Sequence, residues 1–186
     1  MSEEEKETRT GCLAGYSPFF GVGAFAFLEL PEPWELRMIA EPPECDLLGS
    51  WNSTGDFRWV LRGKLKAALV NEEAKRAYLV CVEAKDFARP EDAERYLAKR
   101  LAKREARSRV LERGSLTISG HRAHYMAIAE RERKLLGRGR ERHVLIVAFF
   151  CRETERLLWL ELIGGPYLLE DLEELKPIIS SLSCHG

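Results

Sequence analysis

The 186-residue chain has no glutamine, and its only asparagines are Asn52 and Asn71. Charged residues, in contrast, make up 32% of the sequence, which is above the usual quarter. A shortage of amides combined with an excess of charges is typical of hyperthermophilic proteins, in which ion-pair networks gain value and heat-labile amides are avoided. We therefore expect a thermophilic source.

Short motifs for the common catalytic chemistries are also missing. The sequence contains no phosphate-binding loop, no Gly-x-Ser-x-Gly and no His-Glu-x-x-His. Gly21-Val22-Gly23 resembles the start of a dinucleotide-binding loop, but the third glycine is missing and a strand follows it instead of preceding it. We expect no catalytic residue and no cofactor, and the sequence favours a protein that is not an enzyme.

No apolar run is long and uninterrupted enough to predict a membrane span. The stretch from Gly11 to Leu30 comes nearest, but Ser17, Pro18 and Glu29 interrupt it, so it predicts a loop followed by a strand. The first seven residues are acidic, whereas a signal peptide begins with a basic segment. We therefore expect a cytoplasmic protein that does not associate with a membrane.

None of the five cysteines forms a Cys-x-x-Cys pair, which excludes a zinc ribbon and a thioredoxin-like motif. Cys81 and Cys151 fall in predicted core strands, where cysteine packs as a small hydrophobic residue, and no neighbouring base indicates a nucleophile. The disulfide state of Cys12, Cys45, Cys81, Cys151 and Cys184 stays open. A disulfide involving Cys45, Cys151 or Cys184 is one alternative, because hyperthermophiles do form them inside the cell.

The histidines do not predict a metal site. His121 and His124 lie three residues apart, so in an extended strand they point to opposite faces and do not share an ion. Cys184 and His185 could supply two ligands, but they lie at the end of the sequence, where chains are often frayed. We interpret all four as packing or surface residues.

Alternation of apolar and polar residues predicts a long hairpin, followed by a helix that starts at Pro90. Ala93, Leu97 and Leu101 recur every four residues, and Gly114 suits a C-cap, so the helix is expected over about 90 to 113. A second helix is expected over Leu168 to Leu182, with Pro177 kinking or restarting it. The expected strands are 22–28, 34–40, 57–70, 76–85, 116–118, 124–135, 142–151 and 157–163.

These elements predict an α+β fold, with a mostly antiparallel sheet of about six or seven strands and two main helices packed on it. Residues 1–15 are expected to be a disordered or loosely held acidic tail, because they begin with a run of acids and few apolar side chains. Residues 16–186 are expected to form a single domain.

Three segments, taken with the order of the elements, suggest a known fold. Leu30-Pro31-Glu32-Pro33-Trp34, Leu116-Thr117-Ile118-Ser119-Gly120-His121-Arg122-Ala123 and Ile178-Ile179-Ser180-Ser181-Leu182 make residues 22–184 resemble the PsbP-like α/β/α sandwich fold. An extrinsic subunit of photosystem II and a Ran-binding nucleotide-release factor share that fold. The resemblance implies an accessory or binding module, but it implies no particular partner and transfers no site residue.

A tryptophan in a turn-rich segment suggests our first hypothesis for function. Trp51 lies among Gly, Ser and Asn in a predicted loop over residues 41–56, and aromatic residues on such loops often serve recognition. We therefore expect a non-catalytic binding or accessory module that holds an unknown protein or small ligand.

The charge distribution suggests an alternative, a nucleic-acid or phosphate binder that uses a basic helix over 95–113 and a basic hairpin over 131–142. A solvated surface with pairs such as Glu105–Arg109 explains the same charges, and interleaved aromatics for base stacking are missing. The basic helix could also meet an acidic patch of a second copy in a homo-oligomer. The candidate partner-binding residues are Trp51, Arg100, Arg104, Arg107, Arg138 and Arg140.

Overall fold

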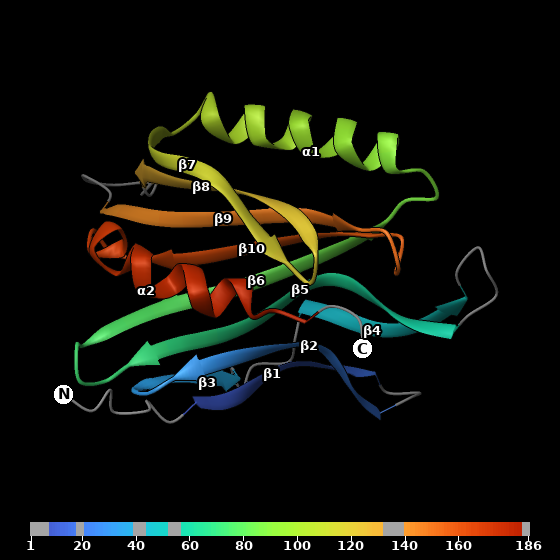
Figure 1. Ribbon diagram of the computed structural model, residues 1–186, viewed down its shortest axis with the longest axis horizontal. Coiled ribbons are helices and arrows are strands. Elements are labelled where there is room, and N and C mark those ends of the chain that lie inside the picture. Colours follow the sequence, from blue (N-terminus) through green and yellow to red (C-terminus); the bar gives the residue numbers. More distant parts are fainter. Residues whose placement is uncertain (1–7, 18–20, 39–43, 52–56, 132–139, 184–186) are drawn as a thin grey trace.

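The computed structural model describes residues 8–17, 21–38, 44–51, 57–131 and 140–183. Within these ranges the chain forms ten strands and two helices (Figure 1). In order they are β1 Thr8–Ser17, β2 Gly21–Pro31, β3 Trp34–Met38, β4 Glu44–Trp51, β5 Phe57–Asn71, β6 Arg76–Asp86, α1 Pro90–Glu105, β7 Arg109–Ile118, β8 His121–Arg131, β9 Glu141–Cys151, β10 Arg156–Gly164 and α2 Leu168–Ser180.

One antiparallel sheet organises the structure, in the order β3-β5-β6-β10-β9-β8-β7. β4 pairs with the first half of the 15-residue strand β5, whereas β3 pairs with its second half. β1 and β2 form a separate antiparallel hairpin. The predicted α+β class, with its antiparallel sheet and two packed helices, is confirmed.

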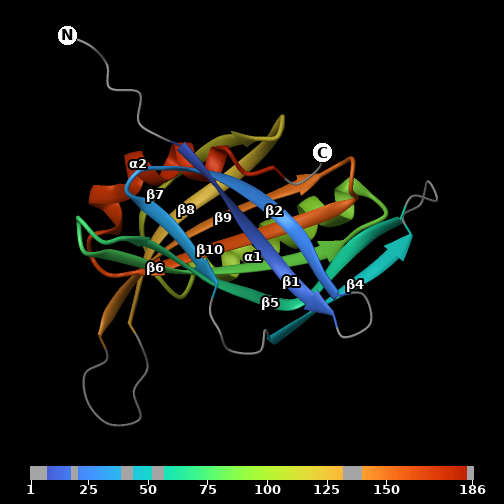
Figure 2. The same cartoon turned by 90° about the horizontal axis from the view of Figure 1, so that it is seen from below.

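The two helices lie on opposite faces of the sheet (Figures 1 and 2). α1 packs on one face, where Leu97 joins a buried cluster with Ile146 and Trp159. α2 and the β1–β2 hairpin cover the other face, where Leu28 and Leu172 share one core. This is a sandwich in which the hairpin extends one of the outer layers.

The first helix is shorter than predicted, because α1 ends at Glu105 and not near residue 113. The four-residue apolar spacing stops at Leu101, and from Arg109 the chain pairs instead with β8. Gly114 is therefore a strand residue and not a C-cap. A Cβ atom there would lie 2.7 Å from the Tyr125 ring, so glycine is needed for this close approach.

Two further predictions differ from the structure. The tail expected up to residue 15 and the loop expected after Gly11 overlap β1, which is a strand from Thr8 to Ser17 because β2 supplies its ladder. The loop expected over 41–56 contains β4, which forms because β5 is long enough to pair with it. Pairing thus outweighs the low strand propensity of Gly49 and Ser50.

A buried tyrosine joins α2 to the sheet. Tyr78 on β6 is completely buried, and its hydroxyl donates to Asp171 Oδ2 on α2 at 2.6 Å. Arg76 Nε donates to the other oxygen of Asp171 at 3.3 Å. Burial, followed by the bond to Asp171, raises the pKa of Tyr78, so the hydroxyl keeps its proton and remains a donor.

α2 continues through Pro177 and ends at Ser180, whereas the sequence predicted that the proline would kink or restart the helix.

We predict that Tyr78→Phe destabilises the fold by about 1–3 kcal/mol, because the buried carboxylate of Asp171 loses a hydrogen-bond donor. Urea or thermal unfolding measures the change. Tyr96→Phe on α1 is the matched control, and its effect is expected to stay within about 0.5 kcal/mol. Equal effects of the two substitutions would show that the bond to Asp171 does not stabilise α2.

A second polar cluster joins β7, β8 and α2. Tyr125 donates to Glu112 Oε1 at 2.8 Å, and Lys176 donates to the same oxygen at 3.1 Å. The hydrogen bond from Tyr125 is the main reason why the pKa of Glu112 lies below its ordinary value. A carboxylate with a lowered pKa in the folded state stabilises that state at neutral pH, and the contribution is lost as the pH falls.

We therefore predict that Glu112→Gln lowers stability at pH 7 by less than about 1 kcal/mol, because the cluster is partly exposed. The difference from the parent protein should shrink as the pH falls below about 4.3, the ordinary carboxyl range. Thermal unfolding across that range tests this, with Glu73→Gln in the exposed β5–β6 turn as the control. A difference that does not depend on pH contradicts the prediction.

Candidate functional site

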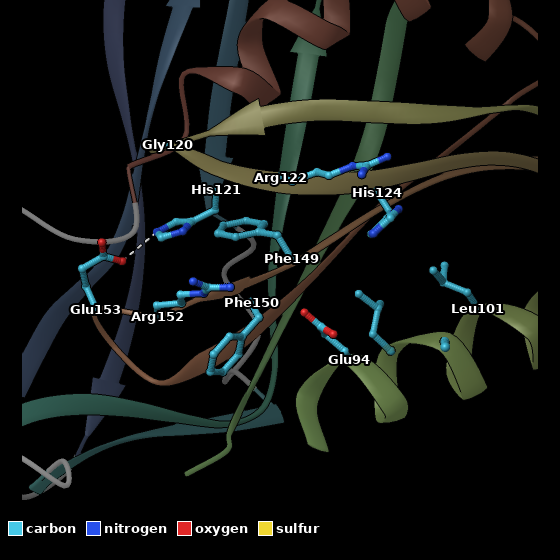
Figure 3. A pocket seen from close by; sticks show the side chains of 12 residues that line it. Glu94, Leu101, Gly120, His121, Arg122, His124, Phe149, Phe150, Arg152 and Glu153 are labelled. Carbon is cyan, nitrogen blue, oxygen red and sulfur yellow. Dashed lines mark ion pairs between the residues drawn. The ribbon is translucent and has the colours of Figure 1, made fainter. Parts of the chain in front are cut away.

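A cavity of about 740 Å³ opens between α1 and one end of the β8–β9 hairpin (Figure 3). Its volume lies within the range of ligand sites in proteins. Apolar side chains from α1 and two phenylalanines of β9 line it together with acidic and basic groups. The lining residues are Glu94, Leu97, Ala98, Leu101, Gly120, His121, Arg122, His124, Phe149, Phe150, Arg152 and Glu153.

Three side chains with metal-binding atoms meet at the rim of this cavity. His121 Nε2 lies 2.8 Å from Glu153 Oε2, and Cys151 Sγ donates to the same oxygen at 3.6 Å. One ligand atom from each residue lies within 4.8 Å of the other two. The Cys151 side chain is completely buried, that of His121 is 12% exposed and that of Glu153 is 56% exposed.

The strand register explains why these residues meet. β8 pairs with β9 up to His124 opposite Ala148, and continuing that register places His121 opposite Cys151. Ser119 and Gly120 both have positive φ, of 47° and 77°, which is typical of the two-residue turns that join hairpin strands. The turn therefore starts β8 at His121. The His121 ring stacks on Phe149, with ring centroids 6.2 Å apart (Figure 3).

This cluster was not predicted from the sequence. His121 was expected to be a packing or surface residue, and no base was expected near Cys151; the second prediction is wrong, because His121 and Glu153 both lie beside the thiol. The exposed side chain of His124 lies three residues along the strand and takes no part in the cluster, as the strand geometry predicted. The signal that could have found it was the pairing of two predicted strands, 124–135 and 142–151, because their register, continued past His124, places His121 opposite Cys151.

Basic side chains line a second hollow, of about 500 Å³, along the C-terminal half of α1. Arg100 forms an ion pair with Glu83 and lies over the Trp159 ring, 3.9 Å from its centroid. Arg104 pairs with Glu130 at 3.0 Å and Glu161 at 3.5 Å. The lining residues are Tyr96, Lys99, Arg100, Lys103, Arg104, Arg107 and Glu130, and we call this hollow the basic groove.

Lys99, Lys103 and Arg107 form the outer wall of the basic groove. All three are exposed, and none of them forms an ion pair with another residue in the described ranges. The two lysines are one four-residue step apart on α1, which corresponds to about 6 Å along the helix axis. Arg107 follows at the same spacing in sequence, just beyond the last helical residue.

The structure brings together three of the six residues predicted to bind a partner. Arg100, Arg104 and Arg107 line the basic groove, although the first two are held in ion pairs. Arg140 is exposed just before β9, and Arg138 lies outside the described residues. Trp51 is the last residue of β4, not part of a loop, and its side chain lies outside the described part. Its role in recognition stays a prediction.

One predicted ion pair is replaced by another. Glu105 was expected to pair with Arg109 at helical spacing, but α1 ends at Glu105 and Arg109 begins β7. Glu105 pairs instead with Arg113 at 3.4 Å, and Arg109 pairs with Glu141 at 3.2 Å. The basic helix expected over 95–113 is therefore divided between α1 and an edge strand.

Comparison with known proteins finds similarity only at the level of structure. No protein-family profile and no curated sequence matches the chain. No helix in the described ranges is long and apolar enough to cross a membrane. The solution structure of cyanobacterial PsbP, CyanoP, from Synechocystis sp. PCC 6803 is 11% identical with a TM-score of 0.44, over 100% of this chain and 96% of that one.

The crystal structure of PA94, a protein of unknown function from Pseudomonas aeruginosa, is 16% identical with a TM-score of 0.45. That match covers 86% of this chain and 92% of PA94. The chain resembles CyanoP, a PsbP-like protein, and PA94 at low identity and at the level of the fold alone, which is the kind of resemblance expected from the sequence.

Proposed function

We propose that the chain is a binding module whose basic groove takes a nucleic acid by its phosphate backbone. The observation that carries this proposal is the lining of the groove, in which five cations face a single carboxylate. Phosphate contacts from Lys and Arg supply most of the affinity in binding that does not depend on base sequence.

The charge does not cancel when neighbouring acids are included. Glu83, Glu130 and Glu161 contact Arg100 and Arg104 at the floor of the groove, where the ion pairs hold the two guanidinium groups against the sheet. The exposed cations of the outer wall are not neutralised in this way within the described ranges. The groove therefore has a paired floor and a positively charged wall.

The arrangement suits a linear polyanion better than a single phosphate group. Lys99 and Lys103 follow one another at a four-residue spacing along α1, and Arg107 follows just beyond its end, so the three charges form a row. The aromatic side chain in the groove, Tyr96, is half-buried and already contacts Lys85 Nζ, which lies 4.1 Å from its ring centroid. Base stacking is therefore not expected, and the proposed contacts are to phosphates only.

We predict salt-dependent binding of a fluorescently labelled DNA duplex, measured by anisotropy. With three phosphate contacts, raising the salt from about 50 to 200 mM should weaken binding roughly 40-fold, since each contact contributes about 0.9 to the logarithmic slope. The triple variant Lys99→Gln, Lys103→Gln, Arg107→Gln should lose most of the affinity and most of the slope. Lys75→Gln, an exposed lysine in the β5–β6 turn, is the matched control and should bind like the parent protein.

Two results would overturn the proposal. One is a failure of duplex and single-stranded DNA to bind even at the lower salt concentration. The other is a triple variant that binds as tightly as the Lys75→Gln control. Poly-glutamate is a useful competitor, because displacement of DNA at equal charge concentration would assign the groove to acidic proteins instead of nucleic acids.

A further inference from the structure

We propose that His121, Cys151 and Glu153 form a binding site for a divalent transition metal, with zinc as the expected ion. The three residues come from the first position of β8, the last position of β9 and the turn that follows β9. One nitrogen, one sulfur and one oxygen atom thereby lie within 4.8 Å of one another. This site shares no residue with the basic groove, so the proposal does not rest on nucleic-acid binding.

The donor set selects the type of metal. Zinc binds Cys, His and Glu in tetrahedral sites, at about 2.0–2.3 Å from each ligand atom. Calcium and magnesium prefer sites made of oxygen alone, whereas thiolate and imidazole favour zinc and its neighbours in the first transition row. Three protein ligands leave a fourth position for water or a small ligand.

Two of the ligands are held in place by the fold. Cys151 is completely buried at the end of β9, and the ring of His121 is positioned by its stacking on Phe149. Glu153 is more than half exposed, so its carboxylate can rotate to admit an ion between itself and the other two side chains. Two fixed ligands and one adjustable ligand make a largely preorganised site.

Binding has a defined proton balance. The thiol of Cys151 becomes a thiolate as the metal–sulfur bond forms, and it releases one proton to solvent. His121 binds through neutral Nε2, the atom that faces Glu153 in this structure. The carboxylate of Glu153 supplies the second negative charge, so the ligands together neutralise a divalent ion.

The geometry favours a metal site over a cysteine nucleophile. The Glu153 carboxylate accepts from the thiol and also contacts the imidazole, so three potential ligand atoms converge on one point, as they do around a metal ion. The sulfur is also buried, whereas reactive cysteines are at least partly exposed.

The neighbouring cavity provides access to the ion. His121 and Glu153 both line it, together with Arg152 and Phe149 (Figure 3). An ion held between them can be reached from solvent through a space of about 740 Å³. The fourth coordination position is therefore expected to exchange water or take a small anion from the cavity.

Titration of tag-free, chelator-treated protein with Co²⁺ tests the proposal. We expect a thiolate-to-cobalt charge-transfer band and the intense visible bands of tetrahedral cobalt, both lost when Zn²⁺ is added. Calorimetric titration with Zn²⁺ in two buffers of different ionisation enthalpy should show release of about one proton per ion at neutral pH. Zn²⁺ should also raise the melting temperature.

Single variants assign the ligands. Cys151→Ala should abolish the charge-transfer band. His121→Gln and Glu153→Gln should each weaken Zn²⁺ binding by at least about tenfold, because even the loss of a group that only hydrogen-bonds to a metal ligand lowers the affinity by about that factor. The side chain of Glu153 is more than half exposed, so Glu153→Gln should fold normally even if replacing the buried cysteine destabilises the protein.

Two controls keep the outcome unambiguous. His124→Gln alters a histidine that lines the same cavity but lies outside the cluster, and it should bind Zn²⁺ like the parent protein. The double variant Cys184→Ala, His185→Gln removes a cysteine and a histidine that are consecutive in the sequence and outside the proposed site. It should also bind Zn²⁺ like the parent protein. Absence of a cobalt–thiolate band, its survival in Cys151→Ala, unchanged Zn²⁺ affinity in Glu153→Gln, or loss of binding in the double variant would overturn the proposal.

Discussion

The burial of β9 on both faces fixes the register of the β8–β9 hairpin, at whose two ends the candidate sites lie. From Val144 to Phe149 no side chain is more than 3% exposed. Ile146 and Ala148 pack towards α1, whereas Leu145 and Val147 pack in the core beneath α2. A slip of one residue in its pairing would exchange these two sets, so the register of β9 against β8 and β10 is strongly determined.

Both candidate sites follow from that register, because they lie at opposite ends of the β8–β9 hairpin. At one end Glu130 faces Arg142 across the ladder, and Glu130 also pairs with Arg104 of the basic groove. At the other end His121 meets Cys151. α1, which has 16 residues, contributes to both sites: Leu97 and Leu101 line the cavity, whereas Arg100 and Arg104 line the basic groove.

Much of the fold could be predicted from sequence because its central strands have strong local signals. The alternation over 76–85 and the apolar run over 142–151 define β6 and β9 closely. β1 and β4 were missed because their stability comes from a partner strand and not from their own composition. The end of α1 was misplaced because Gly114 suits a helix cap equally well, whereas its actual role depends on the ring of Tyr125, a tertiary contact.

The candidate sites were predictable to different degrees for a related reason. The basic residues of α1 are close in sequence, so their clustering could be foreseen, although their pairing with carboxylates on three strands could not. His121, Cys151 and Glu153 meet only through the pairing of β8 with β9, and composition carries no sign of it. The thermophilic source, the cytoplasmic location and the role of Trp51 stay predictions.

The central place of β10 has a consequence for the way the protein is made. β10 lies between β6 and β9, and its residues 156–163 pair with residues 79–86. During synthesis, a sheet of β3, β5 and β6 would therefore keep β6 as an unpaired edge strand, with Val80 and Val82 among its side chains, until β10, the last strand, has been made. Joining segments so distant in sequence is slow, and an unpaired edge of this kind is the place where a nascent chain is most exposed to mispairing with another copy.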